Sequence, residues 1–145
     1  MNRAKRLQPV QELLEDTERK LARSVVVFEQ RVQEAEAKLL ELERYRDEYQ
    51  RQYTERVAQG IGVTGLRDYQ AFLVRLGEAI RQQRTIAQRA SGERDVERAR
   101  WQKAAQRSRA VDHVVDQWQL QEQRAADRRE QIEIDERGQR VRTER

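Results

Sequence analysis

Residues 59–80 read QGIGVTGLRDYQAFLVRLGEAI, a glycine-rich segment followed at once by a regular apolar pattern. From Leu66, alternating steps of three and four residues reach Tyr69, Leu73, Leu76 and Ile80. Such spacing averages about 3.5 residues and keeps one narrow apolar stripe facing a single partner helix over a great length. The pattern is therefore typical of a coiled coil rather than of a globular domain.

The same stepping continues far along the chain. It reaches, after Ile80, Gln83, Ala87, Ala90, Arg94, Glu97, Trp101, Ala104, Ser108, Val111, Val115, Trp118, Glu122, Ala125, Arg129, Ile132 and Glu136. Fourteen of the 21 positions from Leu66 to Glu136 are apolar, although only 37% of the chain is apolar. The series predicts one long helix over about 66–137. Its polar stretch between Gln83 and Glu97 indicates either control of helix register or a flexible point.

An earlier helix is predicted over about 7–58, with Pro9 in its first turn, where a missing N–H costs nothing. Gly60 suits the end of that helix and Thr64 suits the N-cap of the next, which gives a turn over 59–65. A short turn makes the helices antiparallel neighbours. The predicted fold is all-α: two long antiparallel helices in a single coiled-coil hairpin over 1–145, with unequal arms. Counting outward from the turn, Leu7 lies opposite Trp118, residues 120–137 project beyond the first helix, and the polar tail 138–145 frays.

Composition excludes several classes of protein. The chain has one proline and no cysteine, and 39% of its residues are charged, which is typical of long helices. The missing cysteines exclude a disulfide framework, a thiolate zinc site and a cysteine nucleophile. Residues Met1 to Leu14 lack the apolar core of a signal peptide, and no stretch approaches the roughly 20 apolar residues of a membrane span. We therefore expect a cytosolic protein.

Catalytic chemistry is not expected either. Residues 60–65 spell G-x-G-x-x-G, but the dinucleotide fingerprint needs a preceding strand, and here a long helix precedes it. The lone His113 has no partner residues in metal-ligand spacing. Two paired helices offer no cleft in which carboxylates could act as general acids or bases. The prediction is a protein that is not an enzyme and needs no cofactor or metal.

The sequence is more apolar near the turn than a coiled-coil seam requires. Tyr45, Tyr49 and Tyr53 follow Leu42 on the first helix, and Phe72 lies one step off the ladder of the second. The surplus either closes the tip of the hairpin on itself or offers a patch to another protein. Residues 75–109 hold ten basic and four acidic side chains, which suits a solvated, ion-paired face or a surface for an acidic partner.

Several segments in order resemble the FliJ family, the small coiled-coil component of the bacterial flagellar type III export apparatus, over roughly Leu7 to Arg137. They are Leu39-x-x-Leu42-x-x-Tyr45-Arg46-x-Glu48-Tyr49, Gly60-Ile61, Tyr69-Gln70-x-Phe72-Leu73-x-x-Leu76, Ile80-x-x-Gln83, Trp101-x-Lys103 and Arg129-x-Gln131-x-x-x-Asp135-Glu136.

The resemblance implies a protein similar in shape to the two-helix stalk of the rotary ATPase γ subunit. Its implied partners are the hexameric export ATPase, which it promotes, the FlhA export gate and export chaperones, and its implied place is the cytoplasm, peripheral to the inner membrane at the flagellar base. The implied gate-binding residues are Leu42, Tyr45, Tyr49, Phe72, Leu76 and Ala79. The implied ATPase-binding residues are Leu13, Leu14, Arg129, Gln131, Asp135 and Glu136. Leu76 also belongs to the ladder, so only part of it is free to bind.

Three alternatives stay open from the residues alone. One is the related stalk of a virulence-type injectisome. Another is an arginine-rich helical nucleic-acid binder, although no nucleic acid is favoured. The third is a structural coiled coil that dimerises through its flanks.

Overall fold

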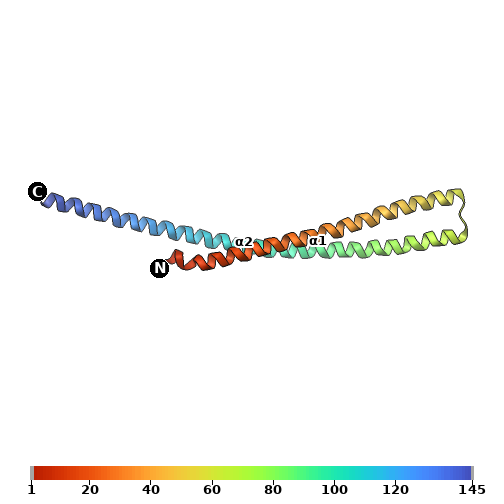
Figure 1. Cartoon of the computed structure of the whole chain (residues 1–145), viewed down its shortest axis with the longest axis horizontal. Coiled ribbons are helices and arrows are strands. Elements are labelled where there is room, and N and C mark those ends of the chain that lie inside the picture. The colour runs from red at the N-terminus through yellow and green to blue at the C-terminus, as the bar shows by residue number, and fades with distance from the viewer. Residues whose placement is uncertain (1, 145) are drawn as a thin grey trace. The chain divides into compact units, whose positions relative to one another are not determined.

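The computed structural model describes residues 2–144, which form two antiparallel α-helices, α1 (Arg3–Gln59) and α2 (Val63–Thr143), packed against each other (Figure 1). No strand occurs among the described residues, and the predicted all-α helical hairpin is confirmed. Contacts divide the chain into two units. Unit 1 comprises α1 up to Lys20 and α2 from Gln102 onward, and unit 2 comprises Leu21–Trp101.

The seam of unit 2 follows the apolar ladder. On α2, Leu76, Ile80 and Ala87 are buried, and on α1 Val32 and Ala35 are buried against them. Removal of this narrow apolar stripe from water is the main force that pairs the helices. Ile80 and Val32 are each 2% exposed, so they are the best-packed positions of the seam.

Two polar side chains are buried in the seam of unit 2, and a third, Ser108, is buried in unit 1. Gln83 is 6% exposed, and its Nε2 donates a hydrogen bond to the backbone carbonyl oxygen of Ala35 on α1 at 3.0 Å. Glu97 is also 6% exposed, and its carboxylate lies 3.2 Å from Nη1 of Arg100. The Gln83 bond links the two helices at one level, which favours the register-control interpretation of the polar stretch.

The turn is shorter than predicted. Gly60 has a φ of +89° and its N–H donates to the carbonyl of Val57, so glycine is required there, as expected for the residue that ends α1. The carbonyl of Gly62 accepts from the N–H of Leu66 at 3.0 Å, and α2 begins at Val63. The N-cap is therefore Gly62 and not Thr64. Glycine is among the residues that are favoured at an N-cap. Ile61 lies over Gly65, where a Cβ atom would come within 2.9 Å of Ile61 Cγ1.

In unit 1, α1 begins at Arg3 rather than at Leu7. The side-chain oxygen of Asn2 accepts a hydrogen bond from the backbone N–H of Lys5 at 2.8 Å, which is the geometry of an N-cap. Pro9 consequently lies inside the helix and not in its first turn, which corrects the prediction. The N-cap and the pairing with α2 stabilise one more helical turn before Pro9 than the preference of proline for the first turn predicts.

The pairing in unit 1 is displaced by about one helical turn from the predicted one. The guanidinium of Arg3 lies 4.9 Å from the ring centroid of Trp118 and donates to Gln121. Gln11 donates to Asp112 at 2.7 Å. Arg3 therefore lies beside Trp118, where counting from the predicted turn placed Leu7, because the turn that sets the register is shorter than expected.

Every side chain from Gln123 to the end of α2 at Thr143 is exposed, as is that of Glu144. This stretch continues beyond the level of Arg3, so no part of α1 covers it. The helix extends to Thr143 and not to 137, and the Thr143 hydroxyl donates to Gln139. The segment predicted as a frayed tail is thus helical up to Thr143, while Arg145 lies outside the described residues. Within residues 2–144, neither helix has a segment both long and apolar enough to cross a membrane.

Candidate docking surfaces

Five aromatic rings gather beside the turn, in unit 2. The Tyr49 ring lies between Tyr69 and Phe72, with centroid separations of 4.9 and 4.4 Å. Tyr45 meets Phe72 edge-on at 5.9 Å, and Tyr53 meets Tyr69 at 5.7 Å. Contacts of this kind each add about 0.5–1.5 kcal/mol beyond burial. The aromatic cluster (Tyr45, Tyr49, Tyr53, Tyr69 and Phe72) therefore closes this end of the hairpin and also forms part of its surface.

The predicted gate-binding residues differ in exposure. Tyr45 is 49% exposed and Leu76 only 7%, while Leu42, Tyr49, Phe72 and Ala79 are half-buried. The seam of α1 passes from Leu42 to Arg46, as steps of 3.5 residues require, and this leaves Tyr45 on the flank. The structure thus brings all six residues into one region, with Tyr45 the most available ring and Leu76 mainly structural.

Tyr53 and Tyr69 belong to the aromatic cluster but not to the predicted gate-binding set. Two signals in the sequence point to them. Tyr53 follows Tyr49 by four residues, which places both rings on one helix face, and Tyr69 precedes Phe72 by three.

Burial raises the pKa of the Tyr49 hydroxyl above its ordinary value of 10.0. The neighbouring hydroxyls of Tyr69 and Tyr45 act in the same direction, and the Arg75 guanidinium opposes them. The neutral phenol is therefore favoured in the folded state.

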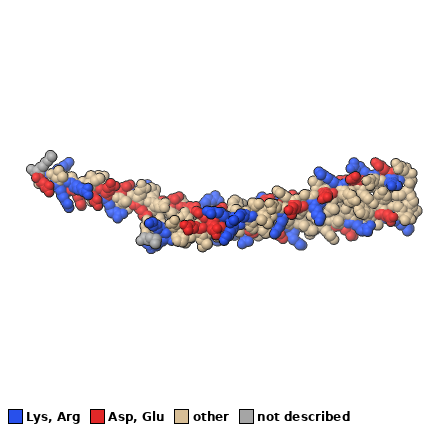
Figure 2. All heavy atoms as spheres, viewed as in Figure 1, with Lys and Arg blue, Asp and Glu red and all other residues tan. Residues whose placement is uncertain are grey.

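A shallow hollow of about 510 Å³ adjoins Tyr45 on α1. Its lining combines apolar and charged side chains: Lys38, Glu41, Leu42, Arg44, Tyr45 and Glu48. Figure 2 shows uncharged atoms prevailing over the turn end of unit 2, with charges at the margins of that region. An uncharged centre with a charged rim is typical of protein-binding surfaces.

The predicted ATPase-binding residues all lie in unit 1 but fall into two groups. Leu13 is exposed and Leu14 half-buried on the part of α1 that pairs with α2. Arg129, Gln131, Asp135 and Glu136 lie on the uncovered stretch of α2 and are exposed. Gln131 donates to Asp135 at 3.3 Å, and Arg129 donates to the carbonyl of Ala125. The structure does not bring the two groups together.

Four of the ten basic side chains in residues 75–109 are in ion pairs. Arg84 pairs with Glu43 at 3.4 Å and Arg98 with Glu29, both across the two helices, and Arg94 and Arg100 pair with acids on α2. Figure 2 shows basic and acidic atoms interleaved on the visible face. Interleaving of this kind suits a solvated, ion-paired face better than a continuous basic track for phosphates.

Residues 2–144 contain no group of side chains placed to hold a metal ion. His113 is exposed and its Nε2 lies 3.1 Å from Nε2 of Gln117. The G-x-G-x-x-G segment forms the turn between two helices, where Gly60 and Gly62 make backbone bonds within the chain.

These features define a class: an all-α coiled-coil hairpin that presents an aromatic cluster beside its turn and an uncovered length of helix in unit 1. Residues 3–143 match the family model of the flagellar FliJ protein, and the chain belongs to the FliJ family. Membership confirms the resemblance and makes the chain a component of the flagellar type III export apparatus. No curated protein and no solved structure matches the chain.

Proposed function

We propose that this chain binds the hexameric ATPase of the export apparatus, promotes its assembly and turnover, and links it to the FlhA export gate. It also handles export chaperones, carries out no catalysis itself, and works in the cytoplasm at the inner-membrane base of the flagellum. Membership of the FliJ family supports this proposal.

The observation that carries the ATPase part is the uncovered stretch of α2 in unit 1. From Gln123 to Glu144 every side chain is exposed, and the charges alternate in sign, as in Arg128-Arg129-Glu130 and Asp135-Glu136-Arg137. At about 1.5 Å per residue, the 21 helical residues from Gln123 to Thr143 extend about 32 Å, which is long enough to enter a protein ring. Dense mixed charge suits a polar channel.

The proposed mechanism follows from symmetry. A helix or a helix pair lacks sixfold symmetry, so the six ATPase subunits contact it differently. Unequal contacts stabilise different nucleotide states in different subunits, and such differential binding biases which site binds or releases nucleotide.

The gate part depends on the aromatic cluster. Tyr45 is the exposed ring, and exposed tyrosines supply large, rigid contact area at binding sites. The half-buried rings Tyr49 and Phe72 contact the Tyr45 ring, so its position is fixed before the partner binds.

Turnover of the purified ATPase tests the first part. Addition of the wild-type chain should raise ATP hydrolysis, and the quadruple alanine variant of Arg129, Gln131, Asp135 and Glu136 should lose most of that increase. Because all four side chains are exposed, helicity should stay unchanged. A matched control replaces the exposed Arg44 and Arg51 of unit 2 with alanine. Stimulation that is absent for the wild type, or is equal for both variants, would contradict the proposal.

Binding to the cytoplasmic part of the gate tests the second part. Tyr45→Ala should weaken binding by about tenfold or more, as hot-spot tyrosines do. Leu40→Ala is the control, because Leu40 is similarly exposed at 47% but lies outside the aromatic cluster. Equal effects of the two substitutions would mean that the cluster serves only to close the hairpin.

A further inference from the structure

The two flanks of the unit 2 seam are built differently. One flank, the ion-paired flank, is closed by the pairs Glu43–Arg84 and Glu29–Arg98 between the helices. The other, the open flank, carries two rows of residues at heptad spacing. They are Arg31, Lys38 and Tyr45 on α1, and Phe72, Ala79, Ile86 and Glu93 on α2. Among the described residues, no ion pair joins these two rows.

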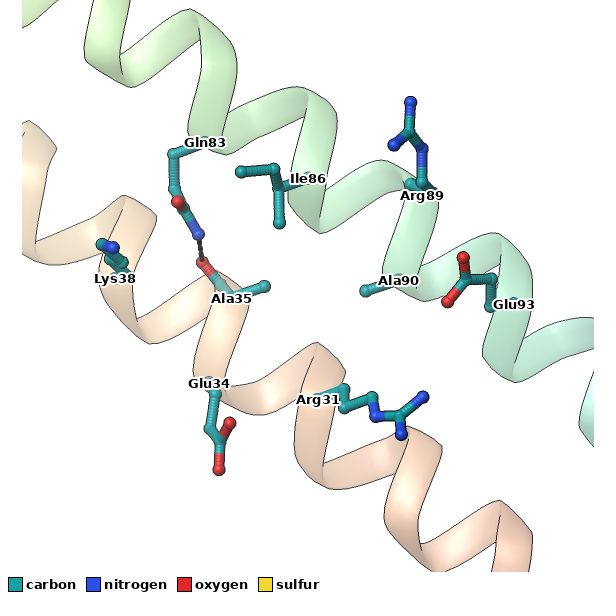
Figure 3. Close-up of a pocket in the computed structure, with 9 residues that line it drawn as sticks. All are labelled: Arg31, Glu34, Ala35, Lys38, Gln83, Ile86, Arg89, Ala90 and Glu93. Carbon is teal, nitrogen blue, oxygen red and sulfur yellow. Dashed lines mark hydrogen bonds between the residues drawn. The ribbon is translucent and has the colours of Figure 1, made fainter.

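The open flank contains a hollow of about 460 Å³ between the helices, away from the turn (Figure 3). Ala35 and Ala90 form its floor, and Ile86, which is 52% exposed, lies beside them. One helical turn further from the tip, Val27 and Val96 are 45% and 63% exposed. Apolar side chains thus remain in contact with water along about two heptads of this flank.

Small residues at the floor decide what can fill the hollow. Helix axes approach one another most closely where the side chains between them are small. Ala35, Ala87 and Ala90 provide such positions in a row, and Gln83 directs its amide to the Ala35 carbonyl instead of into the hollow (Figure 3). The geometry fits the apolar ridge of a third helix, as in helix-in-groove recognition.

The charges of the open flank indicate the polarity of that helix. Arg31, Lys38 and Arg89 line the hollow and form no ion pair, although Arg31 lies 4.9 Å from the ring of Phe28. Of the two acids in the lining, Glu34 points away from α2 and Glu93 extends over the gap (Figure 3). Arg89 likewise points away from α1 (Figure 3), so two cations, Arg31 and Lys38, stand against one inward acid, and this balance favours an occupant with carboxylates beside its apolar ridge.

We propose that the open flank around Ala35, Ile86 and Ala90 is a docking groove for one amphipathic helix of a partner protein. That helix carries an aliphatic ridge with acidic residues next to the side that meets Arg31 and Lys38. The groove lies on the same flank as Tyr45 and Phe72 but shares no lining residue with the aromatic cluster or with the ATPase-binding residues of unit 1, and it does not depend on either of those assignments.

Two synthetic helical peptides of about three heptads test the proposal. Both have leucine at the a and d positions. One has glutamate at the e and g positions and the other has lysine, so that like charges keep each peptide from pairing with itself. Fluorescence anisotropy with the full chain at physiological salt should show the glutamate peptide binding about tenfold tighter or more. Equal binding of both peptides, or no binding, overturns the proposal.

Substitutions locate the site. Ile86→Glu should weaken binding of the glutamate peptide by about tenfold or more, and Arg31→Glu combined with Lys38→Glu should transfer the preference to the lysine peptide. Leu40→Glu is the matched control, because it places the same charge on an exposed leucine outside the groove and should leave affinity unchanged. Circular dichroism checks helicity, and Ile86→Gln replaces Ile86→Glu if the latter loses it. Loss of binding through Tyr45→Ala but not through Ile86→Glu would place the peptide on the aromatic cluster and overturn the proposal.

Discussion

Replacement of Gln83 by leucine tests whether the buried polar side chain serves stability or register. Gln83 is 6% exposed and makes one hydrogen bond, to Ala35. A bond of this kind contributes about 1 kcal/mol net. A leucine buried at the same seam position gains about 2 kcal/mol from burial.

The expected result of Gln83→Leu is an increase in the free energy of unfolding of about 1–2 kcal/mol. The carbonyl of Ala35 keeps its bond within α1, so no acceptor is orphaned. For a chain of this size the change corresponds to a rise in Tm of about 2–8 °C. Thermal unfolding followed by circular dichroism measures it. Gln82→Leu is the control, because residue 82 is exposed and its substitution should change stability by less than about 0.5 kcal/mol.

The same variant should lose specificity. A buried polar residue in a coiled-coil seam fixes register and partner number at a cost in stability. Sedimentation velocity of Gln83→Leu should therefore show higher-mass species that grow with concentration, while the wild type shows none. A fall in Tm relative to the wild type would refute the reasoning, since it would make the Gln83–Ala35 bond worth more than apolar packing.

Three further predictions concern the helix ends and the aromatic cluster. Pro9→Ala should stabilise unit 1 by up to about 3 kcal/mol, because it restores an interior helical hydrogen bond, and slower amide exchange over residues 3–20 measures this. Gly60→Ala should destabilise the hairpin by about 1 kcal/mol, since φ is +89° there, whereas the control Gly62→Ala, without a positive φ, should cost less; equal losses in chemical denaturation would refute this. Tyr49 has a raised pKa, so the unfolded state loses its phenolic proton first as pH rises through about 10, and stability should fall above that pH. Tyr49→Phe should reduce this alkaline loss, as urea titrations at pH 8 to 11 would show.

The seam was predictable because a spacing of 3.5 residues leaves little freedom. Once Leu66 and Ile80 belong to one ladder, the burial of Ala87 and Val115 follows, and both are buried. The same rule places Arg46 in the seam row of α1, although a charged residue is not expected there. An apolar count favours Tyr45, but helical geometry places Arg46 in the half-buried seam row and leaves Tyr45 exposed.

The helix ends were harder to predict because several residues compete for each cap. The N-cap hydrogen bond to Asn2 lets α1 begin at Arg3 although Pro9 then lies inside the helix. Gly62 rather than Thr64 caps α2. Each choice differs by about 1 kcal/mol or less, which the pairing of the two helices readily overrides.

The aromatic cluster was foreseen from the local excess of tyrosines, but the difference between the flanks was not. Glu29 and Arg98 are 69 residues apart in the sequence, and their pairing depends on the antiparallel register that the short turn imposes. The residue pattern of one helix does not show how that helix is aligned with the other. The antiparallel register also decides which residues of α2 share the hollow with Arg31 and Lys38, among them Ile86 and Glu93.

The uncovered length of α2 in unit 1 has a mechanical consequence. A solitary helix in water is held only by its own backbone bonds and local pairs, so its segments open and close with free energies near zero. Such a helix twists and bends readily, and it transmits torsion poorly. A surrounding protein that grips its side chains would suppress those openings and stiffen it, so force could pass through it only while it is engaged. Mechanical coupling through the stretch would then be lost whenever the partner releases it.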